Sequence, residues 1–309
     1  MQSQMRTLAD GLEFPEGPVV LPDGSVVIVE LRAERVTRIW PDGRKEIVAE
    51  VKGGPNGLAM GPGGRLYLCN NGGFQWSRKG SDWFTLASDS YSPGLVQRID
   101  IQSGTVETWL TSLENKHLKG PNDLVFDCFG GLWFTDHGKK RAQTHDYGSV
   151  CYMPAGTREA REVLYPMQPT NGIGLSPDEQ TLYVAETPTA RLWKFSIKSA
   201  GTITPTAVPQ FRHEKGTCIT GANGYQMFDS MAIEACGNIC QATLISGCIT
   251  VIDPSGKIID TFATGDKSTT NIAFGGPELR TAYITLSDSG KVVSVDWPRP
   301  GLPLNFLNK

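Results

Sequence analysis

The chain has 309 residues, of which 39% are hydrophobic, so it can bury a large core. Its 29 basic and 32 acidic residues give a net charge of −3 without any dense Lys/Arg stretch, which argues against a nucleic-acid partner. The first residues lack the basic and apolar regions of a signal peptide, and no stretch approaches the roughly 20 apolar residues that span a membrane. We therefore expect a cytoplasmic protein with no membrane partner, whose 7 cysteines are free thiols.

One type of segment recurs six times along the chain. Each copy reads as a polar residue, a short apolar strand, a tight turn rich in Gly, Pro, Asp or Asn, and a second apolar strand, which is the pattern of a β-hairpin. One or two further β-rich segments follow most copies, and no dozen residues show helical periodicity. The six copies lie at 14–30, 54–70, 120–136, 169–186, 227–244 and 269–286.

This repeat predicts an all-β fold, a six-bladed β-propeller of four-stranded antiparallel blades around a central channel. Residues 1–309 would then form a single propeller domain. The last unit ends one strand short, after GKVVSVDW, and the N-terminal segment QMRTLADGL could supply that strand and close the ring. We expect less than about a tenth of the residues to be helical.

A polar residue precedes the first strand of each hairpin. The first strand of each blade lines the channel of a propeller, so these side chains should form a ring around one mouth of the channel. Carboxylate and amide oxygens without a lysine or arginine among them suit a hard divalent cation, so the ring is a candidate metal site. Its members are Glu16, Asn56, Asn122, Asn171, Asp229 and Asn271.

A second, outer set of polar residues follows from the antiparallel hairpins, because the second strand ends at the face where the first strand begins. His137 stands in this set beside Asp136, and its ordinary pKa suits proton transfer near neutrality. We expect the substrate to contact Asn56 of the inner ring together with members of the outer set, namely Glu30, Asn70 and Glu186.

Two segments, 71–94 and 212–226, are longer than a minimal blade requires, and both attach at this same face. The first carries five aromatic residues, which could form an apolar lid that excludes water and selects a substrate with hydrophobic bulk. The alternative is a loop that packs on the rim for stability. The aromatic residues are Phe74, Trp76, Trp83, Phe84 and Tyr91, of which Trp76 and Trp83 are expected to contact the substrate.

The motifs FPEGPVVLPDG, GPNDLVFDCFGGLWFTD and PTNGIGLSPDEQTLYVAET resemble the senescence marker protein, gluconolactonase and luciferin-regenerating enzyme family, the regucalcin-like propellers. The resemblance runs from about residue 11 to residue 295. It implies a divalent metal held by Glu16 of the EGP motif, Asn171 of the NG motif and Asp229 of the fifth blade. Asn122 of the PND motif is a fourth ligand or a substrate contact. The all-oxygen set favours calcium, while zinc, manganese and iron are also associated with such sites.

The resemblance also implies the activity, metal-dependent opening of a lactone as a small-molecule substrate. A bound cation would polarise the carbonyl, and either Asp229 or His137 would take the proton of the attacking water. Gly120 stands where sugar-acid lactonases of the family often have arginine, and with the aromatic segment it favours a substrate less polar than a sugar lactone. Two other functions stay open: an aryl ester or phosphotriester hydrolase, and a non-catalytic calcium-binding scaffold.

Overall fold

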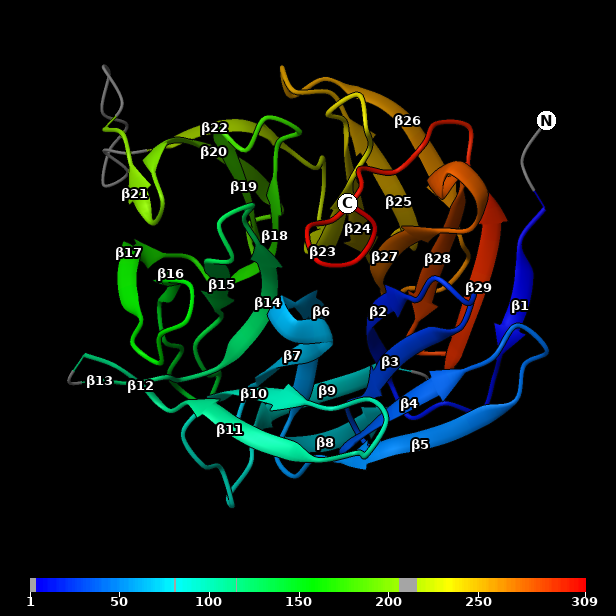
Figure 1. Ribbon diagram of the computed structural model, residues 1–309, viewed down its shortest axis with the longest axis horizontal. Coiled ribbons are helices and arrows are strands. Elements are labelled where there is room, and N and C mark those ends of the chain that lie inside the picture. The colour runs from blue at the N-terminus through cyan, green and yellow to red at the C-terminus, as the bar shows by residue number, and fades with distance from the viewer. Residues whose placement is uncertain (1–3, 81, 115, 206–215) are drawn as a thin grey trace.

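The protein is a ring of six antiparallel sheets around a central channel, as the computed structural model shows for residues 4–80, 82–114, 116–205 and 216–309 (Figure 1). The predicted six-bladed β-propeller is confirmed. Helical structure in the described residues is limited to two short 3₁₀ turns, η1 (Pro62–Gly64) and η2 (Pro277–Leu279).

Each blade begins with the strand nearest the channel and continues outward through neighbouring antiparallel strands. The fourth blade carries one additional short strand, β21, beside β20. The blades consist of β2 (Pro15–Val20), β3 (Val26–Glu30), β4 (Arg35–Ile39) and β5 (Lys45–Glu50); β6 (Pro55–Gly61), β7 (Arg65–Asn70), β10 (Leu95–Ile99) and β11 (Val106–Leu110); β14 (Pro121–Phe126), β15 (Leu132–Asp136), β16 (Gly148–Met153) and β17 (Arg161–Met167); β18 (Thr170–Leu175), β19 (Thr181–Glu186), β20 (Arg191–Ser199), β21 (Thr202–Ile203) and β22 (Gly216–Gly221); β23 (Met227–Ile233), β24 (Ile239–Leu244), β25 (Cys248–Ile252) and β26 (Ile258–Ala263); β27 (Thr269–Gly275), β28 (Thr281–Leu286), β29 (Lys291–Asp296) and β1 (Arg6–Ala9).

The sixth blade is built from both ends of the described chain. Strand β1 pairs antiparallel with β29, with Thr7 opposite Val293, and so takes the outermost position of this blade. The segment that was expected to close the ring, QMRTLADGL, spans residues 4–12 and lies within the described residues.

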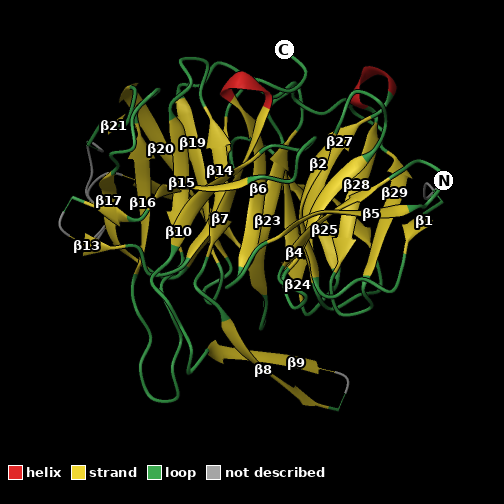
Figure 2. Ribbon diagram, turned by 60° about the horizontal axis from the view of Figure 1, so that its bottom comes forward, coloured by secondary structure: helices red, strands yellow, loops and turns green. Residues whose placement is uncertain are grey.

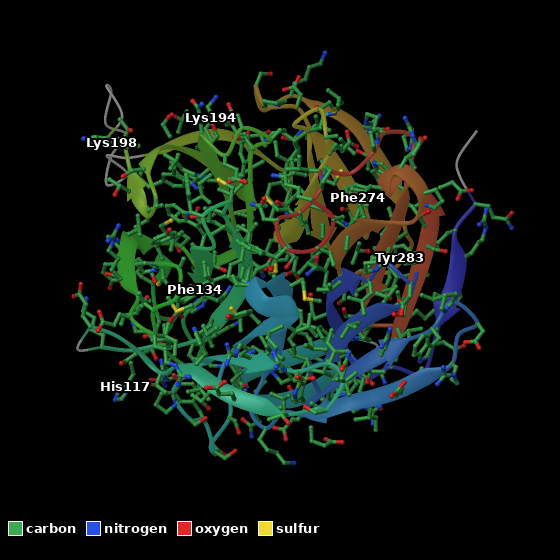
Figure 3. The ribbon with its side chains drawn as sticks, in the orientation of Figure 1. His117, Phe134, Lys194, Lys198, Phe274 and Tyr283 are labelled. Atoms are coloured by element: carbon green, nitrogen blue, oxygen red, sulfur yellow. The ribbon has the colours of Figure 1, made fainter. Side chains whose placement is uncertain are left out.

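Apolar side chains pack between neighbouring sheets and hold the blades together. The inner strands are therefore buried on both faces. Residues Val26 to Val29 of β3 are fully buried, as is Phe134 of β15, while His117 and Lys198 are exposed at the outer edge (Figure 3). The tight turns follow the expected chemistry, since Gly24 of the first PDG turn has a φ of 82°, a conformation that favours glycine.

A β-bulge recurs in the inner hairpin of all six blades, at the start of the first strand. In the first blade the register shifts between Glu16 and Val19, and in the fourth between Thr170 and Ile173. The same shift occurs in the other four blades. A bulge re-aims the side chain that it carries, so the ring of polar residues owes its direction to this repeated irregularity.

Three features stand outside the blades. A separate two-stranded hairpin, β8 (Phe74–Lys79) and β9 (Asp82–Ala87), projects beyond one face of the ring, and the C-terminal segment lies on the opposite face (Figure 2). A small ladder of β12 (Ser112–Leu113) and β13 (Lys116–His117) lies at the periphery. The two faces of the propeller therefore differ, and the aromatic hairpin belongs to only one of them.

Candidate metal centre and substrate cavity

Glycine allows the inner strands of adjacent blades to approach closely around the channel. A Cβ atom on Gly17 would lie 2.6 Å from the carbonyl oxygen of Asn56 in the next blade. A Cβ atom on Gly172 would lie 2.7 Å from the carbonyl oxygen of Asp229. The glycines that follow Glu16 and Asn171 therefore let the chain bring the ring residues together.

Hydrogen bonds between neighbouring blades hold ring residues at two of the blade junctions. The Asn271 amide donates to Glu16 Oε2 at 3.0 Å, across the junction of the sixth and first blades. Ser230 Oγ donates to Asn171 Oδ1 at 3.4 Å, across the junction of the fourth and fifth. Ser230 stands where Gly17 and Gly172 stand in other blades, and its hydroxyl group lies inside the ring.

Two carboxyl groups of the ring, those of Glu16 and Asp229, have raised pKa values. Burial raises the pKa of Asp229 well above its usual range, and the charge of Glu16 raises it further. Burial likewise raises the pKa of Glu16, against the lowering effect of hydrogen bonds that include those from Asn271 and the Gly17 N–H. Two anions in a desolvated site are stabilised by a cation placed between them.

Asp123 is a third buried carboxyl in the channel, and sequence reasoning missed it. It stands where Gly17, Gly57 and Gly172 stand in other blades. Burial, followed by the charge of Glu16, raises the pKa of Asp123 to about 7. The signal was present in the PND motif, which departs from the PNG and TNG copies at this position.

The donor atoms fit a hard divalent cation. Asn122 Oδ1 is buried without a hydrogen-bond partner in the described residues, as expected of an oxygen whose partner is an ion. No group of three His, Cys, Asp or Glu side chains that could hold a metal exists in the described part of the chain. The available set is two carboxylates and two amides, Glu16, Asp229, Asn122 and Asn171, so its chemistry suits calcium better than a metal that prefers nitrogen or sulfur ligands.

Five of the six ring residues form the floor of a cavity of about 560 Å³, namely Glu16, Asn56, Asn122, Asn171 and Asp229. Asn271 lines another cavity, which the C-terminal segment covers. The hairpin β8–β9 contributes aromatic walls. These walls include Phe74, Trp76, Trp83 and Phe84, and Phe14, Leu31, Met227, Leu244 and Ile245 add further apolar surface. The cavity is thus polar at its floor and largely apolar around it.

His137 lies in the cavity wall, as expected from its position beside the ring. Its Nδ1 lies 3.0 Å from the carbonyl oxygen of Thr170, which can only accept, so Nδ1 carries the proton and Nε2 is free to accept one. Burial lowers the pKa of His137 to about 4. His145 also lines the cavity, with its ring centroid 6.2 Å from that of His137.

The structure does not bring Glu30, Asn70 or Glu186 into the cavity. Glu30 binds Arg35 at 2.8 Å and Thr37 at 2.6 Å. The Asn70 amide and the Glu186 carboxylate likewise bind backbone and side-chain groups of their own blades. These strand-end groups fix the loops of the mouth, because a buried carboxylate or amide needs several local partners.

Further residues of the two long segments expected at this face line the cavity. Asn71, the neighbour of Asn70, does line the cavity, and so does Tyr225 of the 212–226 segment. Residues 212–215 of that segment lie outside the described residues.

Comparison with known proteins agrees with this architecture. The model of the family described as SMP-30/Gluconolactonase/LRE-like region matches residues 14–288. The chain belongs to this family. The match contains every ring residue, from Glu16 to Asn271.

Relatives that resemble this chain in sequence carry the names gluconolactonase and lactonase. A gluconolactonase from Zymomonas mobilis is 25% identical over 312 residues, covering 93% of this chain and 80% of the relative. Lactonase drp35 from Staphylococcus haemolyticus is 26% identical over 252 residues, covering 80% of this chain and 68% of the relative.

Solved structures share the fold. A gluconolactonase from Xanthomonas campestris superposes with a TM-score of 0.75 at 20% identity, covering 96% of this chain and 90% of the other. Regucalcin from Agrobacterium tumefaciens, described as a calcium-binding protein, superposes with a TM-score of 0.77 at 17% identity, covering 99% and 98%. No helix in the described residues has the length and apolar character required to cross a membrane.

Proposed function

We propose that this propeller is a metal-dependent lactonase, a carboxylic ester hydrolase that opens a cyclic ester with water. The observation that carries the proposal is the site itself. Two buried carboxyls, Glu16 and Asp229, and the unpartnered oxygen of Asn122 lie at the floor of a cavity of small-molecule size. Relatives named gluconolactonase and lactonase support the same reaction class.

One divalent ion, calcium first by donor hardness, would be held by Glu16, Asn171 and Asp229, with Asn122 as the fourth protein ligand. When bound, the ion supplies Lewis acidity to the carbonyl of the lactone and makes a nearby water more acidic. All four proposed ligands line the same cavity, which supports an ion at its floor.

Asp229 is proposed to take the proton from the attacking water. Its carboxylate lines the cavity beside the other ligands, and the oxygen that does not bind the ion would be free to accept the proton. His137 is the alternative base, since its Nε2 is unprotonated. Its pKa of about 4 makes the ring a weak base at neutral pH, so we assign it to orienting the substrate through a hydrogen bond.

The substrate is proposed to be less polar than a sugar lactone. Trp76 packs against Phe14 at a centroid distance of 4.9 Å and against Trp83 at 6.0 Å, which gives the cavity a continuous aromatic wall. Such a wall rewards the burial of an apolar substituent and offers few hydrogen bonds to hydroxyl groups.

A substrate and metal panel tests this function. Hydrolysis is followed by proton release with dihydrocoumarin, aliphatic γ-lactones and glucono-δ-lactone, each with chelator, calcium, zinc, manganese or iron. We expect turnover that chelation abolishes and calcium restores, with dihydrocoumarin preferred. Turnover of phenyl acetate or paraoxon but of no lactone would favour the ester or phosphotriester alternative, and no turnover of any compound would favour a binding protein.

A further inference from the structure

Lys139 is a deeply buried charged residue outside the ring. It follows β15 in the segment that carries His137, and only 1% of its surface is exposed. Burial lowers the pKa of its ammonium group to about 7 against the raising effect of the Asp136 charge, and no salt bridge of Lys139 is found among the described residues. Burying an ammonium group without an ion pair destabilises a fold, so the hydrogen bonds of Lys139 indicate its role.

The hydrogen bonds of this ammonium group go to the segment that leads into the β8–β9 hairpin, and it also lies 5.3 Å from the ring centroid of Tyr91, beyond the end of β9. Nζ donates to Asn71 Oδ1 at 2.8 Å and to the Gly73 carbonyl oxygen at 3.0 Å. It also lies 4.1 Å from the ring centroid of Phe74, the first residue of β8. Lys139 therefore holds the incoming end of the hairpin from a neighbouring blade.

The next residue holds the outgoing end. The Ala87 N–H, at the end of β9, donates to the Lys140 carbonyl oxygen at 2.8 Å. Residues 139 and 140 thus fasten both ends of the hairpin to the third blade.

The contacts of the hairpin with the first blade are of a different kind. The Arg32 guanidinium lies 4.4 Å from the Trp83 ring centroid, and Phe14 packs on Trp76. Arg32 is about one third exposed, so this side can separate more readily than the buried Lys139 side. The anchor of the hairpin is consequently at Lys139.

We propose that Lys139 is a positioning residue for substrate selection: it fixes the aromatic hairpin of residues 74–87 above the cavity through two directed hydrogen bonds. The selection part rests on the proposed lactonase function, whereas the placement of the hairpin does not. Phe74, Trp76 and Phe84 line the cavity, so the placement of the hairpin determines the wall that meets an apolar substituent.

A residue that served only packing would gain nothing from the charge. Methionine has a similar length and would fill the same volume without the cost of burying an ammonium group. It cannot donate to Asn71 or to Gly73. Lys139→Met therefore separates anchoring of the hairpin from stability of the propeller.

The experiment compares Lys139→Met, Lys139→Gln and Arg141→Gln with the unaltered, metal-loaded protein. Glutamine keeps one N–H₂ donor, and Arg141 belongs to the same loop but bonds to Asp146 at 3.1 Å instead of the hairpin. The readouts are hydrogen exchange of residues 74–87, thermal melting, and kcat and KM for dihydrocoumarin and γ-butyrolactone.

For Lys139→Met we expect exchange of the hairpin at least about 10-fold faster and a melting temperature equal or higher. KM for dihydrocoumarin should rise about 10-fold with kcat within about twofold, because uniform binding is lost, and KM for γ-butyrolactone should change little. Lys139→Gln should recover part of both effects, and Arg141→Gln should show neither.

Unchanged hairpin exchange in Lys139→Met would overturn the proposal, and so would a lower melting temperature with equal losses for both lactones. Faster exchange in a protein that hydrolyses no lactone would uphold the anchor, overturn its part in substrate selection, and refute the proposed function separately.

Discussion

Replacing Glu16 by glutamine and Asp229 by asparagine should impair the enzyme in two different ways. Both changes keep the size of the side chain and remove one negative charge, so both should weaken the cation. Only Asp229 is also proposed to accept a proton, and the loss of a general base costs about 10²–10⁴-fold in rate, or about 3–5 kcal/mol. Saturating metal should therefore restore most of kcat to Glu16→Gln and little to Asp229→Asn.

The same two variants should stabilise the metal-free protein. Burial raises the pKa of both carboxyls above the values they have in the unfolded chain, so at neutral pH their ionised forms destabilise the folded state. Each pH unit between the folded and unfolded pKa of a carboxyl corresponds to about 1.4 kcal/mol. A neutral amide removes that cost, and the metal-free variants should melt at a higher temperature than the metal-free parent at pH 7.5.

The assay is kcat measured at increasing calcium, with thermal melts in chelator and His137→Ala as the comparison. Full recovery of Asp229→Asn together with an inactive His137→Ala at saturating metal would identify His137 as the base. Metal-free variants that melt below the parent would refute the electrostatic reasoning.

The remaining predictions concern other parts of the molecule. The pH–rate profiles of the parent and His137→Ala should run parallel from pH 5 to 8, because burial keeps the His137 imidazole neutral above its pKa of about 4. Loss of an acidic limb near pH 6–7 in the variant would contradict this prediction. Trp76→Ala should raise KM about 10-fold for dihydrocoumarin and less than about threefold for glucono-δ-lactone in initial-rate assays, because it removes a large apolar contact; equal effects would exclude the aromatic wall from recognition. Glu30→Ala should lower stability by about 3 kcal/mol in urea unfolding and leave KM within about twofold, because its carboxylate binds only its own blade; a large KM effect would return it to the substrate site. Deletion of residues 1–10 should lower the melting temperature by about 5 °C or more, since β1 is a strand of the sixth blade, and an unchanged melt would show that this pairing contributes nothing.

The fold could be predicted from the sequence because its information is local and repeated. Each hairpin carries its own turn residues and its own polar residue, and six copies reinforce one another. The ring residues Glu16 and Asn171 could be placed for the same reason, since the repeat fixes the end of the strand at which each one stands. The topology then brings them together.

The errors and omissions have a different origin, because they concern contacts between segments that the repeat does not relate. Glu30 and Asn70 stand at the correct face, but whether such a side chain turns to the cavity or to its own loop depends on partners such as Arg35. Lys139 in the run HGKKR reads as a surface charge. Its burial depends on a hairpin that leaves the second blade more than fifty residues earlier.

The C-terminal segment lies on the face of the propeller opposite the β8–β9 hairpin (Figure 2). Leu302 and Leu307 line a small apolar cavity there, Asn305 donates to Glu179 at 2.7 Å, and Phe306 packs on Phe126 at a centroid distance of 5.8 Å. These contacts hold the C-terminal segment over the channel at this face, whereas the larger cavity lies at the other face, beneath the aromatic hairpin. Under the proposed lactonase function, the lactone and the opened hydroxy acid would contact the same cavity walls, so the hydroxy acid should act as a competitive inhibitor of lactone hydrolysis.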